Sequence, residues 1–458
     1  MPLQTREADR AVQQFSEIFM SSRSQTPRST TPRIWPVVAI ASLTSLLSAC
    51  VSTLTLGGAS TAWPTRADVV ANQSDFTAEG LAALDARMKE AVDKKQVAGL
   101  EYALFKGGRL AAFNIHGNQS SDGPPMTEDT IFRIRSMSKP VTGVALMQLY
   151  EQGKWSLDDP ITKFVPEFEK LKVYSEDKDK NPILVNVSRP ATMRELFTHT
   201  AGFGYGLSAS TAVDRMFIAD HPMGKKDLKA LIDRVAEIPL LAQPGERWSY
   251  SIGIDVQGAI VERLSGQSFG SYLKANIFDP LGMKDTSFLI SEKDRPRLAT
   301  VYQRNNETGA MAVFPDAPDR DFFKADHAES GGGGLASTTH DYARFVQMLI
   351  NDGSLDGARI LKPETVKLMM TNQIGDMRAM GGGGWGLGGA LTTAPPSEKA
   401  PQPAGTFSWF GIDGSWFWVD PVNDIGFVGM IQRRGGAGPG SVDLRGESPQ
   451  LVYKALAQ

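Results

Sequence analysis

The sequence predicts an α+β protein, a layer of strands and helices into which a mostly helical domain is inserted. Strand-like runs occur near both ends of the globular part of the chain. The stretch between them holds mostly helical patches separated by loops that contain Gly and Pro. Hydrophobic residues make up 41% of the 458 residues, which is typical of a globular protein with a large core. We therefore expect residues 75–160 and 340–458 to form an α/β domain and residues 161–339 a mostly helical domain.

The α/β domain is expected to begin with a helix and a hairpin. Apolar residues recur at helical spacing between Leu81 and Val92, which predicts a helix over Phe76–Gln96. Two short strand-like runs follow, Leu100–Lys106 and Leu110–His116, and a Gly-Gly pair joins them. Two such runs around a glycine turn are typical of a β-hairpin.

Further along the chain, a helix is expected over Ser136–Gln152, because Gly153 gives a stop signal. Strand signals return near the end of the chain and a final helix closes it, at Phe407–Phe410, Ser415–Val419, Ile425–Met430 and Pro449–Leu456. Two glycine runs, Gly331–Gly334 and Gly381–Gly384, are interpreted as tight loops.

The N-terminus has the composition of an export signal. Several Arg residues precede the apolar run Ile34–Ala49, whose 16 residues fall short of the ~20 needed to span a bilayer. The run ends in Leu-Ser-Ala-Cys, which resembles a bacterial lipobox with Cys50 as the lipidated residue. We therefore expect residues 1–49 to be a signal peptide, with Met20 as a second possible start, and residues 50–74 to be a tether. The mature protein is expected in the periplasm, lipid-anchored to the bacterial membrane, with the outer membrane favoured; the alternative is a small buried Cys beside an ordinary cleavage site.

Composition excludes several classes of function. The chain carries 48 Lys+Arg against 51 Asp+Glu, a net charge of −3, so it lacks the basic footprint of a nucleic-acid-binding protein. Its single Cys and five His residues show neither a disulfide pair nor the spacing of metal ligands. We expect no metal, no cofactor and no nucleic-acid partner. The sequence specifies no oligomeric state.

Two serines are candidates for a nucleophile. Ser268 lies in a Gly-x-Ser-x-Gly pattern, which works as a nucleophile elbow only between a strand and a helix. The preceding segment Asp255–Leu264 has helical spacing and ends at Ser265-Gly266, which is interpreted as a helix C-cap. This context argues against the elbow.

The other candidate is Ser136, in a Ser-x-x-Lys pattern that ends in Lys139. Pro140 follows, and Pro is tolerated only in the first turn of a helix, so the helix is expected to start near Ser136. The serine then lies where free backbone N–H groups favour an oxyanion, and Lys139 lies on the same face one turn away. An ammonium there stabilises an alkoxide, whereas a desolvated neutral Lys accepts the proton. The alternative is an N-capped surface helix.

The flanks of Ser136 carry a specific resemblance. Residues Thr130–Pro140, TIFRIRSMSKP, are similar to the nucleophile segment of the serine β-lactamase-like superfamily, with class C β-lactamases and family VIII carboxylesterases as the most similar groups. Other segments resemble the superfamily in the same order along nearly the whole mature chain: Gly153–Pro160, Glu195–Gly202, Pro244–Ser251, Gly331–Ser337 and Trp416–Pro421. The resemblance implies a β-lactamase/transpeptidase-like fold, with an antiparallel sheet flanked by helices.

The resemblance also implies roles for individual residues. Ser136 matches the acylated nucleophile, and Tyr250 matches the tyrosine that acts as general base or protonates the leaving group. A free Tyr has a pKa near 10, so as a base it needs a nearby cation, which Lys139 can supply. The backbone N–H groups of Ser136 and Ile412 match the oxyanion hole.

The third motif of the superfamily departs from Lys-Thr-Gly. The stretch here is Trp409-Phe410-Gly411, which resembles the W-x-G variant of the esterases, and Gly411 lets the strand approach closely. Trp409 replaces the lysine with which β-lactamases attract the carboxylate of the drug. Ile252 likewise replaces the asparagine that contacts its amide side chain. Both differences favour neutral, apolar esters over β-lactams.

A few residues near these motifs have weaker signals. Phe203 and Tyr205 are expected to border the acyl pocket because of their position, and His199 is interpreted as a hydrogen-bonded loop residue. Arg433 or Arg434 could restore a carboxylate contact, but arginines that follow a strand are usually solvated.

These observations predict a serine hydrolase of short-chain carboxylic esters that works through an acyl-enzyme and has at most weak β-lactam hydrolysis. One alternative is a β-lactamase or D-Ala-D-Ala peptidase acting on peptidoglycan-type substrates. The other is a non-catalytic, penicillin-binding-like protein. The expected partners are a small-molecule ester and, through the lipid anchor, the membrane. The natural ester and its acyl length are not specified by the sequence.

Overall fold

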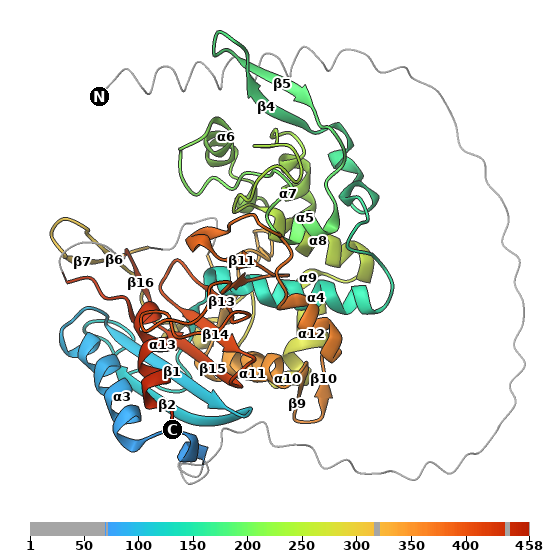
Figure 1. The fold of residues 1–458 in the computed structure, drawn as a ribbon. Helices are drawn as coiled ribbons and strands as arrows, with labels where there is room; N and C mark the ends of the chain where they lie inside the picture. The colour runs from blue at the N-terminus through green and yellow to red at the C-terminus, as the bar shows by residue number, and fades with distance from the viewer. Residues whose placement is uncertain (1–68, 70–71, 316–320, 436–439, 458) are drawn as a thin grey trace, which may run out of the picture. The chain divides into compact units, whose positions relative to one another are not determined.

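The computed structural model describes residues 69, 72–315, 321–435 and 440–457 (Figure 1). The expected signal peptide at residues 1–49, Cys50 and most of the expected tether lie outside the described residues. Among the helices of the described part, none is long and apolar enough to cross a membrane.

The largest sheet of the described part has seven antiparallel strands (Figure 1). The strand order is β11-β12-β13-β14-β15-β1-β2, so the first two strands of the chain lie beside the last ones. The bounds are β1 Gly99–Lys106, β2 Arg109–Gly117, β11 Gly384–Trp385, β12 Ala390–Leu391, β13 Phe407–Phe410, β14 Trp416–Asp420 and β15 Ile425–Met430. The predicted hairpin is confirmed, because β1 and β2 pair antiparallel around Gly107 and Gly108, whose φ angles are 58° and 67°. The three strands predicted near the end of the chain also form.

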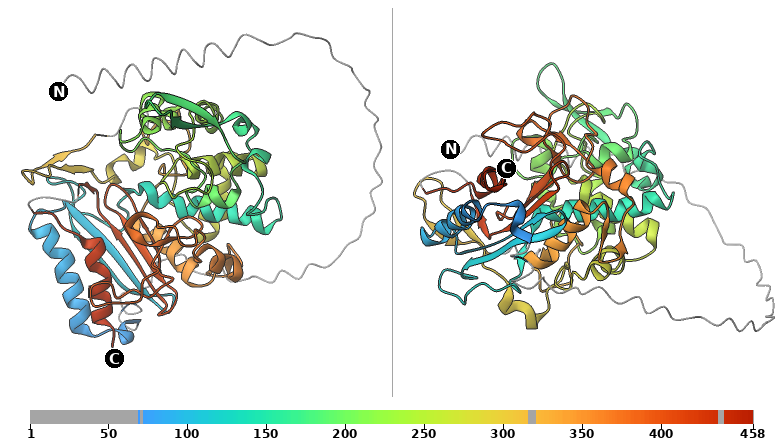
Figure 2. Two further views of the ribbon diagram at one scale, coloured as in Figure 1. Left: turned by 45° about the horizontal axis from the view of Figure 1, so that its top comes forward. Right: turned by 60° about the horizontal axis from the view of Figure 1, so that its bottom comes forward.

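The sheet is buried on both faces because its strands carry apolar side chains at odd and even positions. On β14, Trp416 and Trp418 point to one face, while Phe417 and Val419 point to the other. Helices α3 (Ala78–Asp93) and α13 (Leu444–Ala455) cover the first face and lie side by side, as both views of Figure 2 show.

The opposite face packs against helix α11 (Thr339–Ile350), behind which lie helix α4 (Ser138–Glu151) and most of the remaining helices. Helix α4 is apolar nearly all round, and eleven of its fourteen residues are buried. A helix with this composition belongs in a core rather than at a surface. It packs against α8 (Gly253–Ser265), and the turn Arg135–Met137 that precedes its N-terminus contacts β13, an inner strand of the sheet.

The segment between β2 and α11 holds most of the other helices, which are α5 Met193–Phe197, α6 Ala212–Asp220, α7 Leu228–Val235, α9 Phe269–Leu273 and α10 Asp279–Leu281. Helix α12 spans Pro363–Met369. Short helical turns are found at Asn72–Asp75, Arg135–Met137, Ile161–Lys163, Pro166–Lys170, Pro222–Gly224, Lys274–Phe278, Glu292–Arg297 and Met380–Gly382. Residues Thr61–Gln458 group as one compact unit, and the division into two domains stays a prediction.

Small strand pairs that the sequence analysis did not predict interrupt this helical segment. They are β3 (Phe132–Arg133) with β8 (Ala336–Ser337), β4 (Lys172–Glu176) with β5 (Pro182–Asn186), and β6 (Tyr302–Arg304) with β7 (Met311–Val313) and β16 (Arg433–Arg434). A further pair joins β9 (Ser354–Leu355) to β10 (Ala358–Arg359). Most are two or three residues long, too short for an alternating pattern to be recognised in sequence.

Both terminal helices form, but their boundaries differ from the predicted ones: α3 spans Ala78–Asp93 instead of Phe76–Gln96, and α13 spans Leu444–Ala455 instead of Pro449–Leu456. Helix α3 starts after Thr77, whose side chain accepts a hydrogen bond from the backbone of Gly80. Helix α13 starts at Leu444, five residues before the predicted start at Pro449. Asp443 caps this helix by accepting from the N–H of Gly446, so an N-cap rather than the proline fixes the start.

Candidate active site

Ser136 lies on a turn of 3-10 helix, Arg135–Met137, immediately before α4. The α-helix was expected to start near Ser136 and begins two residues later, at Ser138. The Ser138 hydroxyl holds the turn in place, because it donates to the carbonyl oxygen of Arg135 at 2.7 Å and accepts from the N–H of Leu335 at 3.1 Å. Ser136 is therefore fixed at the positive end of the α4 dipole.

Lys139 is fully buried one turn further along, beneath Ser136. Its Nζ lies 3.3 Å from Ser136 Oγ, 3.2 Å from the Tyr205 hydroxyl and 2.5 Å from the carbonyl oxygen of Gly332. The Ser-x-x-Lys spacing thus brings the two side chains together as predicted. Tyr205, which was expected only to border the acyl pocket, also contacts the lysine directly.

Burial lowers the pKa of Lys139 to about 7, and the negative charge of Asp255 opposes this shift only in part. A large fraction of the side chain is then a neutral amine at neutral pH. A neutral amine has two N–H donors, which match Gly332 and Tyr205, and one lone pair, which can accept the proton of the Ser136 hydroxyl. The geometry therefore fits Lys139 as the group that deprotonates the serine.

A glycine loop holds the lysine in place. The N–H of Gly332 donates to Asp255 Oδ1 at 3.1 Å, and the Ser330 hydroxyl donates to the same oxygen. A Cβ at position 332 would lie 2.5 Å from Asp255 Oδ2 and 2.6 Å from the Tyr205 hydroxyl, so only Gly fits there. The sequence analysis interpreted Gly331–Gly334 as a tight loop and missed its contact with Lys139.

Asp255 is a functional residue that the sequence analysis also missed. It is fully buried on α8, and its Oδ2 has no hydrogen-bond partner in the described part of the chain. A carboxylate within the apolar run of α8, Gly253–Val261, is the signal that could have identified it, because a buried acid requires a reason.

Tyr250 lies on the other side of Ser136. Its hydroxyl accepts a hydrogen bond from Trp409 Nε1 at 3.1 Å, and Lys139 Nζ lies 4.5 Å from the centre of its ring. Burial raises the pKa of Tyr250 well above its ordinary value, and hydrogen bonds with Ser136 and Trp409 offset this only partly. The phenol is therefore protonated at neutral pH. Of the two roles that the resemblance implies, a protonated phenol fits the one that protonates the leaving group, and the role of Tyr250 stays a prediction.

Strand β13 and the turn after it form the third side of the site. A Cβ at Gly411 would lie 2.6 Å from the carbonyl oxygen of Ile134, so Gly permits the predicted close approach to the nucleophile turn. The N–H of Ile412 has no acceptor in the described part of the chain, and the residue is 56% exposed. Trp409 supplies a hydrogen bond to Tyr250 in addition to the expected apolar surface.

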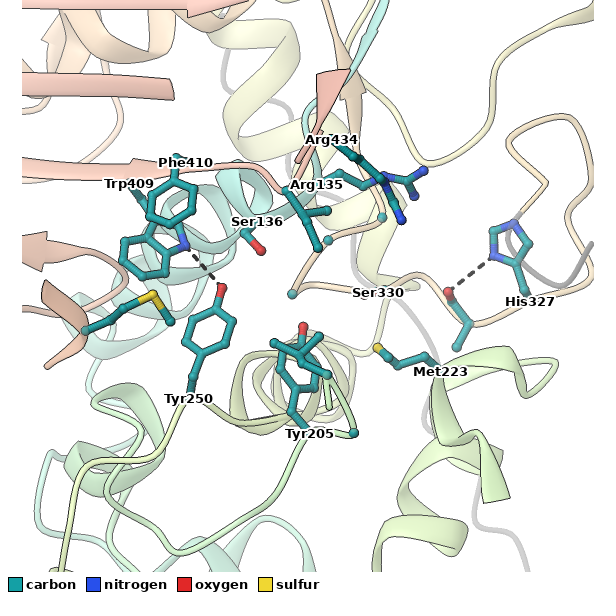
Figure 3. A pocket seen from close by; sticks show the side chains of 18 of the residues that line it. Arg135, Ser136, Tyr205, Met223, Tyr250, His327, Ser330, Trp409, Phe410 and Arg434 are labelled. Atoms are coloured by element: carbon teal, nitrogen blue, oxygen red, sulfur yellow. Dashed lines mark hydrogen bonds between the residues drawn. The ribbon is translucent and has the colours of Figure 1, made fainter. Parts of the chain in front are cut away.

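These residues surround a cavity of about 410 Å³ (Figure 3). Ser136, Tyr205, Tyr250, Trp409, Phe410 and Ile412 line it. The other apolar side chains of its wall are Leu207, Met223, Phe322, Ala328 and Met380. A cavity of this volume accommodates a small organic molecule.

Of the predicted substrate-binding residues, Gly411 meets the nucleophile turn and does not line the cavity in the described part of the chain, and two others lie elsewhere. Ile252 is fully buried beneath the site and does not line the cavity in the described part of the chain. Phe203 packs against Phe168 and lines a separate cavity behind the site. Both residues were predicted from their positions in the sequence. The chain turns between Phe203 and Tyr205, so that Tyr205 lines the cavity with Ser136 and Phe203 does not.

The expectation that the two arginines after β15 are solvated is wrong. Arg433 is buried and donates to the carbonyl oxygen of Val442. Arg434 lines the cavity, where its Nε donates to Asp413 Oδ1. The short pairing of β16 with β6 places them against the rest of the protein rather than in solvent.

His199 is a buried structural residue, as expected. Its Nδ1 lies 2.9 Å from Ser251 Oγ and accepts from the N–H of Ser251 at 3.1 Å. Burial, and to a lesser extent the charge of Lys139, hold its pKa well below the ordinary range, so the ring stays neutral.

The alternative nucleophile, Ser268, lies outside the cavity. It caps α9 through a hydrogen bond from the N–H of Ser271, and the preceding segment is helix α8, which ends at Gly266 in the left-handed conformation. The strand that a nucleophile elbow requires is therefore replaced by a helix.

A serine on the turn before a buried helix, a buried lysine in the first turn of that helix and an antiparallel strand beside them define a protein of the β-lactamase/transpeptidase-like fold. Residues 84–448 match the model of the Beta-lactamase family. The chain belongs to this family.

Several relatives have known names or structures. The chain is 31% identical to Esterase EstB of Burkholderia gladioli over 389 residues, which cover 80% of this chain and 94% of that protein. It is 35% identical to Protein Rv1367c of Mycobacterium tuberculosis over 76% of this chain and 88% of that protein. The solved structure of EstCE1, a hydrolase with promiscuous acyltransferase activity, is 27% identical, with a TM-score of 0.68 over 82% of this chain and 98% of that chain. Simvastatin synthase from Aspergillus terreus superposes with a TM-score of 0.71 at 23% identity over 82% of this chain and 98% of that chain, which shows a shared fold.

Proposed function

We propose that the protein is a serine carboxylesterase that hydrolyses small esters through an acyl-enzyme on Ser136. The observation that carries the proposal is the contact of 3.3 Å between Lys139 Nζ and Ser136 Oγ, together with a lysine pKa lowered to about 7 by burial. This pair supplies an activated nucleophile at neutral pH. EstB and EstCE1 bear the names of an esterase and a hydrolase, which supports the same reaction class.

In the proposed first step, Ser136 Oγ attacks the ester carbonyl and Lys139 accepts its proton. The N–H groups of Ser136 and Ile412 donate to the oxyanion. The Tyr250 hydroxyl donates its proton to the departing alkoxide, and the Lys139 ammonium, whose Nζ lies 4.5 Å from the centre of the Tyr250 ring, returns a proton to the tyrosinate. Water then attacks the acyl-enzyme, and the same groups transfer protons in the reverse direction.

The cavity wall supports esters rather than β-lactams. Trp409 stands where a β-lactamase has a cationic lysine, and its Nε1 is occupied by Tyr250. Trp409 therefore offers neither a positive charge nor a free N–H to a substrate carboxylate on that side of Ser136. We propose that β-lactams are poor substrates for this reason.

A second candidate activity is acyl transfer to an alcohol. EstCE1 is described as a hydrolase with promiscuous acyltransferase activity, and an acyltransferase of Penicillium decumbens, calJ, is 29% identical over 65% of this chain and 74% of that protein. A largely apolar cavity favours an alcohol over water as the second acceptor.

Two measurements test the proposal. A short-chain p-nitrophenyl ester and a chromogenic cephalosporin are compared as substrates, and a fluorophosphonate is used to label the nucleophile. We expect ester turnover to exceed cephalosporin turnover, and the label on the peptide that contains Ser136. Faster turnover of the cephalosporin would favour the β-lactamase alternative, and the absence of both turnover and labelling would favour a non-catalytic binding protein.

We also propose that Cys50 carries a lipid anchor and that the enzyme acts in the periplasm, on the basis of the signal-like segment before it. Cys50→Ser should abolish incorporation of labelled palmitate in the expressing bacterium. Equal incorporation by both forms would contradict the anchor and leave the esterase proposal intact.

A further inference from the structure

The wall of the cavity opposite Trp409 is charged. Arg135 and Arg434 lie side by side there, and Figure 3 shows them on the other side of Ser136 from Trp409 and Phe410. Arg135 immediately precedes the nucleophile, and Arg434 comes from β16. The sequence analysis gave Arg433 or Arg434 as an alternative carboxylate contact but favoured solvated side chains, and it made no prediction for Arg135.

One buried carboxylate organises both arginines. Asp413 is fully buried, its Oδ2 accepts from Arg135 Nε at 2.6 Å and its Oδ1 accepts from Arg434 Nε at 2.5 Å. Asp413 directly follows Ile412, the expected oxyanion donor. The two guanidinium groups are thus fixed to the turn that faces the reacting carbonyl.

Arg434 presents its remaining donors to the cavity. Its Cζ lies 4.0 Å from the centre of the Phe314 ring, so a cation–π contact holds the guanidinium group in addition to Asp413. Its Nη1 and Nη2 form no hydrogen bond with any residue of the described part, and the side chain is 19% exposed. Two parallel N–H donors at a fixed orientation match the two oxygens of a carboxylate.

The charge around the cavity is positive on this side. Asp413 is a single carboxylate between two guanidinium groups, and no Asp or Glu is among the described residues that line the cavity. A positive charge at a partly desolvated wall attracts an anionic group much more strongly than it would in water.

We propose that Arg434, with Arg135 beside it, binds a carboxylate carried by the ester substrate, on the side of Ser136 opposite Trp409. The inference rests on the proposed esterase function and narrows its substrate class to esters that bear a carboxylate on the acyl or the alcohol part. The side opposite Trp409 is not the place from which the family's lysine holds the β-lactam carboxylate. The substrate carboxylate is therefore expected at another distance and in another direction from the scissile bond than the carboxylate of a β-lactam bound by that lysine.

The test compares esters that differ only in this charge. For the acyl part, the substrates are the mono-4-nitrophenyl ester of adipic acid and the 4-nitrophenyl ester of adipic acid monoamide. For the alcohol part, they are 3-acetoxybenzoate and 3-acetoxybenzamide. We expect wild-type enzyme to prefer the anionic member of one pair, and Arg434→Gln to lower the ratio of kcat/KM within that pair by about 10- to 100-fold, as expected for a charge-assisted hydrogen bond. The loss should be mostly in KM, since the contact is present before and during the reaction.

Two variants serve as controls. Arg434→Lys keeps the charge but loses the paired donors, so it should retain part of the preference. Arg109→Gln removes an exposed arginine on β2 that has no side-chain partner among the described residues, and it should leave the ratio unchanged. Circular dichroism and the Tm of each variant establish that the fold is kept. An unchanged ratio in folded Arg434→Gln, for both pairs, would overturn the subsite.

A binding measurement separates this inference from the esterase proposal. Calorimetry with Ser136→Ala should detect adipic acid monoamide but not adipamide, and the added Arg434→Gln change should abolish the difference. If wild-type enzyme hydrolyses none of the four esters, the esterase proposal fails, while calorimetry still decides the subsite. If the neutral esters are hydrolysed and neither assay shows a preference for the anion, the subsite alone fails.

Discussion

Ser136 and Ser268 both fit a sequence pattern of hydrolytic nucleophiles, and both lie next to the start of a helix, yet their surroundings differ completely. Ser136 lines a cavity of about 410 Å³, and a fully buried lysine lies 3.3 Å from its hydroxyl. Ser268 is exposed, and its hydroxyl donates to Ser271 Oγ at 2.8 Å while accepting from the N–H of the same residue. One serine faces a base and the other caps a helix.

The difference shows what a short pattern can and cannot specify. Spacing along a helix determines which side chains share a face, so Ser-x-x-Lys is enough to place the two groups one turn apart. It does not determine whether water reaches them. Burial lowers the pKa of Lys139, and that burial comes from α8, the glycine loop and Tyr205, which are distant in sequence.

The largest expected effect tests this comparison directly. Ser136→Ala should lower kcat by about four orders of magnitude or more, because the nucleophile, base and oxyanion donors act as a unit. Ser268→Ala should keep full turnover and cost about 0.5–2 kcal/mol of stability through the lost N-cap. Ester turnover and urea denaturation of both variants provide the measurement. Loss of activity in folded Ser268→Ala, or a fluorophosphonate adduct on its peptide, would reverse the assignment.

The next effect concerns the hydroxyl of Tyr250. Tyr250→Phe removes this group alone and should lower kcat by about 10²–10⁴-fold, the usual contribution of a proton-transfer residue. The double variant with Lys139→Met should lose far less than the product of the two single losses, because both residues serve one proton path. Single-turnover kinetics of the three variants measure this. Losses that multiply fully would argue against a shared step.

Substrate preference is expected to change by a smaller factor. Trp409→Lys places a cation on the apolar side of the cavity and should shift the ratio of kcat/KM toward a carboxylate-bearing β-lactam by roughly 10- to 100-fold. The same change removes the hydrogen bond to Tyr250, so some ester activity should be lost. Circular dichroism must first show an unaltered fold. A wild-type enzyme that prefers a cephalosporin to every ester tested would contradict the argument from Trp409.

The smallest effect is a displacement of the pH profile. Because the pKa of Lys139 is lowered to about 7 and the neutral amine accepts the proton, kcat/KM should rise with pH as this value is crossed. Asp255 raises the pKa of Lys139, so Asp255→Asn should move the acid limb of the profile to lower pH. Profiles of kcat/KM between pH 5 and 9 test both statements. A rate that falls through pH 7 would indicate that the lysine acts as a cation.

Much of the fold could be predicted from the sequence because it depends on local patterns. The hairpin around Gly107 and Gly108 follows from the need for positive φ at a tight turn, and the strands Phe407–Phe410 and Ile425–Met430 form within their predicted bounds. The short strand pairs could not be predicted, because two or three residues are too few to show the alternation of apolar and polar side chains that marks a strand. The start of α13 was missed because the N-cap Asp443 outweighs the preference of Pro449 for a first turn.

The sequence by itself determined the serine, the lysine and the tyrosine, because a resemblance of ordered motifs and a helical spacing identify residues that must come together. The tertiary structure alone decided their chemistry. Desolvation of Lys139 and Tyr250, the close approach at Gly332, and the pairing of Arg135 with Arg434 through Asp413 all depend on segments that are distant in sequence. Electrostatic free energies depend on how much water is excluded and on which charges face each other, and neither quantity is written in local sequence.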